Sequence, residues 1–239
     1  MARELPYVGP PERGRVFRVS RGFDVFAPPE WSWAHEDGTF GNRFDDPGKY
    51  RGIPEEDRFR VVYCATQRAG AFGETIARFR RSPRLAEGLG AIDDEEPLEA
   101  GLEGGELPEE WRLGRRLGST RLDEGLLFAD LASAEGFQIL TEELAPMLVR
   151  FGLPEFDLSL ITSRKRRVTQ EAARYAYELA GLGQAVAGVR YLSRLNPEWE
   201  LWAVFHDRMV HSPEDLSETV REDDTGLLEA ASVLGIEIR

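Results

Sequence analysis

Three side chains in the first third of the sequence have the chemistry to hold and break a dinucleotide. Arg43 stands in a turn rich in Gly, Asp and Pro, Tyr63 lies near the end of an apolar run, and Glu74 follows eleven residues later. A guanidinium can bind a diphosphate through two parallel hydrogen bonds. A tyrosine ring can stack on a planar heterocycle, and a carboxylate can stabilise an oxocarbenium-like transition state. Together these residue types suit cleavage of a ribosyl bond in a bound dinucleotide.

The pattern around these residues predicts a strand followed directly by a helix. Residues 59–66 are apolar and β-branched, which favours a buried strand that carries Tyr63. From 69 to 79 the apolar residues recur with helical spacing, and Glu74 lies on the side opposite their stripe. Periodicity alone makes Glu74 a solvated helix residue. Its small neighbours, however, would let another backbone or a ligand approach closely (Gly70, Gly73 and Ala77).

The rest of the chain predicts a mixture of strands and helices. Residues 27–58 are punctuated by Gly, Pro and Asp and predict a long ordered loop, which in a compact domain is often functional. Strands are expected at 14–19, as one or two within 115–131, and at 156–162, 189–193 and 199–206, with helices at 134–151 and 169–180. Without βαβ regularity, the predicted fold class is α+β: a single domain over 1–239 with a mixed β-sheet core and flanking helices.

The acidity of the chain is concentrated in one segment. The 239 residues have a formal net charge of −13. Residues 87–110 hold ten acidic side chains and no lysine or arginine, so the rest of the chain sits near −3. We expect this segment to be an insertion. A basic pocket elsewhere is compatible with this charge, whereas broad binding to a nucleic-acid backbone is disfavoured because it requires a positive face.

Several classes of site are excluded by what the sequence lacks. It has no Walker-type glycine loop, no HExxH motif and no nucleophile elbow. The single cysteine, Cys64, excludes an internal disulfide and a cysteine-based zinc site, and the scattered His35, His206 and His211 do not suggest a metal site. No apolar run approaches the length of a membrane span, and the start lacks an apolar signal segment. A cytoplasmic protein is the expectation.

Two basic features each have a structural and a functional interpretation. Arg43 precedes Asp45 and Asp46, and either carboxylate would be able to anchor it in the turn. The basic residues 164–167 precede the predicted helix 169–180. They suit a solvated surface loop. They also suit an anion site, because their charges would add to the exposed amides of a helix N-terminus.

The motifs, taken in order, resemble the RES family, which is named for its Arg, Glu and Ser. The similarity runs roughly from Arg18 to His206. Its motif positions are matched by Phe17–Arg18, Gly41–Phe44, Tyr63 with Glu74, Thr169–Gln170 and Gly188–Ser193.

The sequence departs from the family pattern at two positions. Val19 stands where the family often has an aromatic residue after the first arginine. Arg167 stands where a serine commonly precedes the late helix, so either Ser163 or Ser193 would have to supply the hydroxyl.

The resemblance implies a core like that of the ADP-ribosyltransferases, with NAD as substrate and no metal. Arg18 and Arg43 would hold the pyrophosphate, and Tyr63 would stack against the nicotinamide. Glu74 would bind the 2′-hydroxyl of the nicotinamide ribose and stabilise the charge that develops as nicotinamide leaves. Further contacts to NAD would come from a set on the later elements (Arg167, Thr169, Gln170 and Ser193).

The same resemblance implies the biological setting. The ADP-ribosyl acceptor would be inorganic phosphate, water or a protein side chain, and the sequence does not choose among them. Such an enzyme would be the toxin of a pair, neutralised by a helix-turn-helix antitoxin, with no direct contact to nucleic acid or membrane. The sequence leaves a homodimer open. The alternative is a nucleotide-binding or scaffold protein that keeps the fold without the chemistry.

Overall fold

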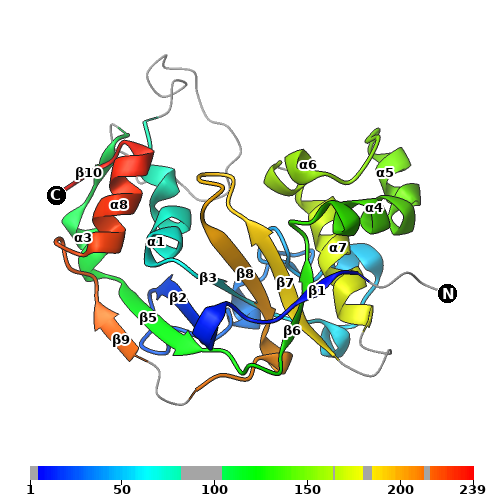
Figure 1. Cartoon of the computed structure of the whole chain (residues 1–239), viewed down its shortest axis with the longest axis horizontal. Coiled ribbons are helices and arrows are strands. Elements are labelled where there is room, and N and C mark those ends of the chain that lie inside the picture. The colour runs from blue at the N-terminus through cyan, green and yellow to red at the C-terminus, as the bar shows by residue number, and fades with distance from the viewer. Residues whose placement is uncertain (1–4, 82–103, 164, 180–184, 213–215) are drawn as a thin grey trace.

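An eight-stranded sheet forms the centre of the fold in a computed structural model that describes residues 5–81, 104–163, 165–179, 185–212 and 216–239 (Figure 1). Neighbouring strands run antiparallel except β6 and β7, which are parallel. The predicted α+β class is therefore confirmed. In spatial order the strands are β1 (Tyr7–Val8), β6 (Leu127–Asp130), β7 (Val186–Leu192), β8 (Glu200–Phe205), β3 (Val61–Ala65), β2 (Arg15–Ser20), β5 (Arg116–Arg121) and β9 (Leu216–Thr219).

Two groups of helices cover one face of this sheet. α1 (Arg68–Ile76) and α8 (Thr225–Leu234) pack at the end near β2 and β3, and the second group packs near β7 (Figure 1). The second group comprises α4 (Ala134–Glu143), α5 (Ala145–Arg150), α6 (Leu158–Thr162) and α7 (Arg166–Glu178). Alternate residues of the central strands, such as Val61, Leu201 and Val189, pack against these helices in one large core.

The opposite face of the sheet is covered by loop residues. Val62, Trp202 and Phe128 form a second, smaller core there with Val25 and Phe26 from the loop after β2. The central strands are thus buried on both faces, which is why β3 has an uninterrupted apolar sequence at 61–65.

Two predicted elements differ from the structure. Residues 156–162 do not form a strand: Asp157 caps the helix α6 by accepting a hydrogen bond from the backbone N–H of Leu160. The predicted helix 134–151 is two helices, α4 and α5, that meet at Leu144. The helix α8, whose Gly226 packs against the start of α1, was not predicted, although Asp224 and Gly235 are residue types that commonly cap the two ends of a helix.

Most of the predicted acidic insertion, 87–103, lies outside the described residues. Its end at 104–110 packs into the fold, where β4 (Glu106–Leu107) pairs in parallel with β10 (Glu237–Ile238) and Leu107 is fully buried. The short helix α3 (Glu109–Leu113) follows. None of the helices in the described ranges combines the length and hydropathy that a membrane crossing requires.

Candidate active site

Glu74 is hydrogen-bonded to Ser193, which lies 119 residues further along the chain. The exposed Glu74 sits on α1, and Ser193, only 4% exposed, directly follows β7. The serine Oγ donates to the glutamate Oε1 at 2.5 Å. The other candidate hydroxyl, Ser163, donates instead to the carbonyl of Leu160 in α6. Of the two serines, Ser193 is the one that the fold joins to Glu74.

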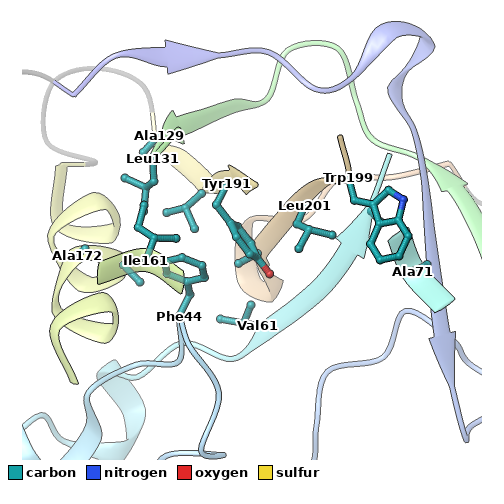
Figure 2. Close-up of a cluster of buried hydrophobic side chains, with 14 of the residues drawn as sticks. Phe44, Val61, Ala71, Ala129, Leu131, Ile161, Ala172, Tyr191, Trp199 and Leu201 are labelled. Carbon is teal, nitrogen blue, oxygen red and sulfur yellow. The ribbon is translucent and has the colours of Figure 1, made fainter. Parts of the chain in front are cut away.

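The glycines beside Glu74 make room for a tryptophan. A Cβ at Gly73 would overlap the six-membered ring of Trp199, and one at Gly70 would lie 3.2 Å from the Trp199 Cβ. The indole is buried against α1 near Ala71 (Figure 2). The backbone N–H of Ser193 donates to the carbonyl of Trp199 at 3.0 Å, which closes the β7–β8 turn. Packing of Trp199 on α1 therefore holds the serine beside the glutamate.

Arg43 points toward the C-terminal end of α6. Its Nη1 donates to the carbonyl oxygens of Ile161 and Ser163, the latter at 2.8 Å. Burial lowers the pKa of Arg43 and the nearby Arg194 adds to this effect, while Tyr191, Glu74 and Tyr63 oppose it. Arg43 and Glu74 are therefore close enough for the carboxylate to raise the pKa of the guanidinium.

Asp45 organises the turn that carries Arg43. Its Oδ2 accepts hydrogen bonds from the backbone N–H groups of Phe40 at 3.0 Å and Asn42 at 2.7 Å, and its Oδ1 accepts from the hydroxyl of Tyr63. Burial raises the pKa of Asp45, which the two backbone hydrogen bonds oppose. Asp45 therefore anchors backbone amides and a tyrosine, and the guanidinium of Arg43 is held by carbonyl groups.

Tyr63 joins the central sheet to the same turn. Its hydroxyl donates to Asp45 at 3.2 Å and accepts from the backbone N–H of Phe44 at 2.9 Å. Burial raises its pKa well above the ordinary value, and Asp45 adds to the rise. The phenol is therefore neutral at physiological pH, and its ring orientation is fixed by hydrogen bonds at the hydroxyl.

Helix α7 secures the turn from the other side. The Oγ1 of Thr169 donates to the carbonyl of Arg43 at 2.6 Å, and the Nε2 of Gln170 donates to the carbonyl of Asn42 at 3.0 Å. Both side chains are buried. As the structure stands, they position the backbone around Arg43.

A sequence model of the RES domain matches residues 15–223, nearly the whole chain. The chain belongs to the RES domain family. Among solved structures, the M. tuberculosis MbcT–MbcA toxin–antitoxin complex is similar at 14% identity with a TM-score of 0.47, covering 92% of this chain and 88% of that chain. No curated protein matches. The family prediction made from the Arg, Tyr, Glu and Ser motifs is confirmed.

An open cavity of about 430 Å³ lies next to the Arg43 turn of this RES domain. Gly41 and Gln170 contribute to its wall, together with Arg167, whose guanidinium carbon lies 3.9 Å from the ring centroid of Tyr50. Its lining carries both charges, because Arg166 lies there together with Glu36 and Asp37. The predicted residues Arg167 and Gln170 thus come together here, beside the cluster formed by Arg43, Tyr63, Glu74 and Ser193.

Arg18 is not brought into this cluster. Arg18 and Phe17 are neighbours on β2, so their side chains point to opposite faces of the sheet. Phe17 packs with the helices, and Arg18 therefore faces the smaller core. Its Nη1 donates to the carbonyl of Ala27 at 3.0 Å. Burial lowers the pKa of Arg18, and Cys64 and Asp24 on the same side of the sheet oppose this. The expectation that Arg18 joins Arg43 at one anion is not met by the geometry.

Sequence reasoning overlooked Tyr191 as a site residue of the RES domain. Its ring packs against that of Phe44 (Figure 2), and the two ring centroids lie 4.6 Å apart. Burial raises its pKa and Glu74 adds to the rise, while Arg43 opposes it. The signal was present, because residues two apart on a strand share a face and Ser193 directly follows the strand that holds Tyr191. Among the described residues, no group of His, Cys, Asp and Glu is arranged to hold a metal ion.

Proposed function

We propose that this RES domain consumes NAD by cleaving the bond between nicotinamide and ribose. The observation that supports it best is the 2.5 Å hydrogen bond from Ser193 to an exposed carboxylate, Glu74. That bond occupies Oε1 and orients the carboxylate, and Glu74 Oε2 has no hydrogen-bond partner among the described residues. A preorganised negative charge of this kind stabilises positive charge that develops in a transition state.

In the proposed reaction the C1′–N bond of the nicotinamide riboside breaks, and its electron pair leaves with nicotinamide. Because the pyridinium nitrogen is cationic in NAD, the leaving group departs neutral and needs no protonation. Positive charge develops on the ribose ring, where Glu74 stabilises it and binds the 2′-hydroxyl. An acceptor oxygen or nitrogen then bonds to C1′ through its lone pair, and any proton on that atom is released to the solvent. Phosphate, water and a protein side chain would give phosphorolysis, hydrolysis and ADP-ribosyl transfer respectively.

The remaining residues bind and orient the dinucleotide. Arg43, whose guanidinium donates to carbonyl groups and to no carboxylate of the described residues, would hold the pyrophosphate. The ring of Tyr63, fixed through Asp45, would stack against the nicotinamide. Tyr191 packs behind the Arg43 turn through Phe44 and helps to set its position.

The cavity beside the turn suits the adenosine end of the same ligand. It adjoins Arg43 through Gly41 and presents both Arg167 and Tyr50. Its volume of about 430 Å³ is within the usual range for a small-molecule site, about 300–1,000 Å³. Thr169 and Gln170 would then act on NAD indirectly, by holding the wall that separates the cavity from Arg43.

On the family resemblance, we further propose that the enzyme is the cytoplasmic toxin of a toxin–antitoxin pair. Its protein partner would be a helix-turn-helix antitoxin that prevents loss of NAD in the producing cell.

Incubation of the purified protein with NAD tests this function. The reaction is run with and without inorganic phosphate, and with a cell extract as a source of protein acceptors, and products are resolved by mass spectrometry. Release of nicotinamide supports the proposal, and the ADP-ribosyl product identifies the acceptor. Intact NAD under all three conditions would contradict it. Saturable NAD binding without turnover would then favour the scaffold alternative.

A further inference from the structure

Arg194 directly follows the serine that binds Glu74. Ser193 is fixed by its bond to Glu74, and its own Oγ accepts the backbone N–H of Leu195 at 3.0 Å. These bonds hold the backbone on both sides of Arg194. In Figure 1 the turn joining β7 to β8 stands between α1 and the helix group α4–α7, which are the elements that carry Glu74 and secure Arg43.

The side chain of Arg194 is exposed, and no carboxylate of the described residues forms an ion pair with it. The guanidinium of Arg43 donates to carbonyl oxygens and not to a carboxylate of the described residues. Among the described residues, neither guanidinium forms an ion pair with a carboxylate, and Glu74 is the carboxylate that acts on the pKa of Arg43. Such an arrangement is costly without an anion, because like charges repel each other.

The two turns that carry these arginines are joined by a ring contact: Phe44, which follows Arg43, packs against Tyr191 near the end of β7 with ring centroids 4.6 Å apart. Arg194 lowers the pKa of Arg43, in the same direction as burial does. A ligand with two negative charges would relieve this repulsion, and each guanidinium can bind one phosphate group through two hydrogen bonds.

We propose that Arg43 and Arg194 together hold the diphosphate of the substrate, one from the turn before β3 and the other from the β7–β8 turn. The inference rests on the proposed function and adds to it a second diphosphate ligand, in the role that the sequence had assigned to Arg18. A pair of arginines would also make the site selective for ligands with two phosphate groups. A dinucleotide or an ADP-ribosyl group, with two adjacent phosphates, should be preferred to a mononucleotide with one.

Calorimetric binding of ADP-ribose, which contains the diphosphate and lacks the reacting bond, tests this inference without relying on turnover. In Arg194→Gln we expect the Kd for ADP-ribose to rise about 10-fold to 100-fold, the range for losing hydrogen bonds to a charged group. Arg194→Lys, which keeps the charge without the planar fork, should lie in between. The matched control is Arg121→Gln, an equal change of charge at an exposed arginine that ends β5.

Binding of nicotinamide mononucleotide should weaken much less than binding of ADP-ribose in Arg194→Gln. An unchanged Kd for ADP-ribose in that variant would overturn the inference, and so would an equal loss in Arg121→Gln, which would indicate a general effect of charge. Failure of the wild-type protein to bind ADP-ribose would overturn it as well. If ADP-ribose binding depends on Arg194 but NAD remains intact, the diphosphate site stands and the proposed enzymatic function fails.

Discussion

The hydroxyl of Ser193 and the carboxylate of Glu74 are joined by a hydrogen bond of 2.5 Å between the β7–β8 turn and helix α1. The serine is buried and the glutamate is exposed. One oxygen of the carboxylate is thus fixed from inside the protein, while the helix surface around it stays open to a ligand.

Removing this hydroxyl should lower the rate of NAD cleavage. In Ser193→Ala, Glu74 keeps its charge and loses its fixed orientation, so we expect kcat to fall about 10-fold to 100-fold, the value of one charge-assisted hydrogen bond. The control is Ser163→Ala, which removes a hydroxyl bonded to the Leu160 carbonyl. Its kcat should stay within about threefold of the wild-type value, because a substitution away from the site changes free energies by about 0.5 kcal/mol or less. The reverse order of the two variants would assign the serine role to Ser163.

The hydroxyl of Tyr63 should contribute to stability. Tyr63→Phe leaves the backbone N–H of Phe44 and an oxygen of Asp45 without their partner, which we expect to lower the free energy of unfolding by about 1–3 kcal/mol in urea. The control is Tyr177→Phe, whose hydroxyl bonds the half-exposed Asp207 and should change stability by less than about 1 kcal/mol. Equal effects in the two variants would show that the Tyr63 hydroxyl does not anchor the turn.

The contact between Gly73 and Trp199 should couple stability to activity. A methyl group at Gly73 overlaps the indole ring, so Gly73→Ala should lower the free energy of unfolding by about 1–3 kcal/mol through overpacking and reduce turnover as α1 shifts. Adding Trp199→Leu to Gly73→Ala should recover part of both losses. Gly9→Ala, where a Cβ meets nothing within 4 Å, is the control. A fully active Gly73→Ala protein would show that α1 and Trp199 move without disturbing Glu74.

The single cysteine should be unreactive in the folded protein. Burial raises the pKa of the Cys64 thiol to about 12, although Arg18 opposes the rise. At pH 8 an ordinary thiol is ionised to roughly a quarter, whereas one with a pKa near 12 is ionised to about one part in ten thousand. Reaction with an aromatic disulfide reagent should therefore be slow until denaturant is added. Rapid reaction under native conditions would mean that the smaller core opens readily.

The sequence was most informative where the relevant contacts are local. Tyr63 and Glu74 are joined by a strand that passes directly into a helix, so the apolar run, the change of period and their spacing were sufficient to place both. The prediction of a strand at 156–162 was wrong. Alternation of apolar residues over so few positions does not distinguish a strand from a capped helical turn.

Contacts between distant segments were less predictable. The choice between Ser163 and Ser193 depends on how the β7–β8 turn packs against α1. The local sequence around either serine does not predict this long-range contact. The sequence also did not indicate that Arg18 faces the smaller core, away from the helices. Because the central strands are buried on both faces, their sequence does not tell which face meets the helices.

The central claim is that the negative charge of Glu74 stabilises positive charge on the ribose as nicotinamide leaves. It is tested most directly by comparing kcat and the NAD dissociation constant of Glu74→Gln with those of the wild-type protein. The exchange preserves size and most hydrogen-bonding capacity, so we expect kcat to fall about 10²–10³-fold, the scale for one preorganised electrostatic group. NAD affinity should change far less, because the ground-state ribose has no such charge. A folded Glu74→Gln protein that cleaves NAD at the wild-type rate would contradict the account.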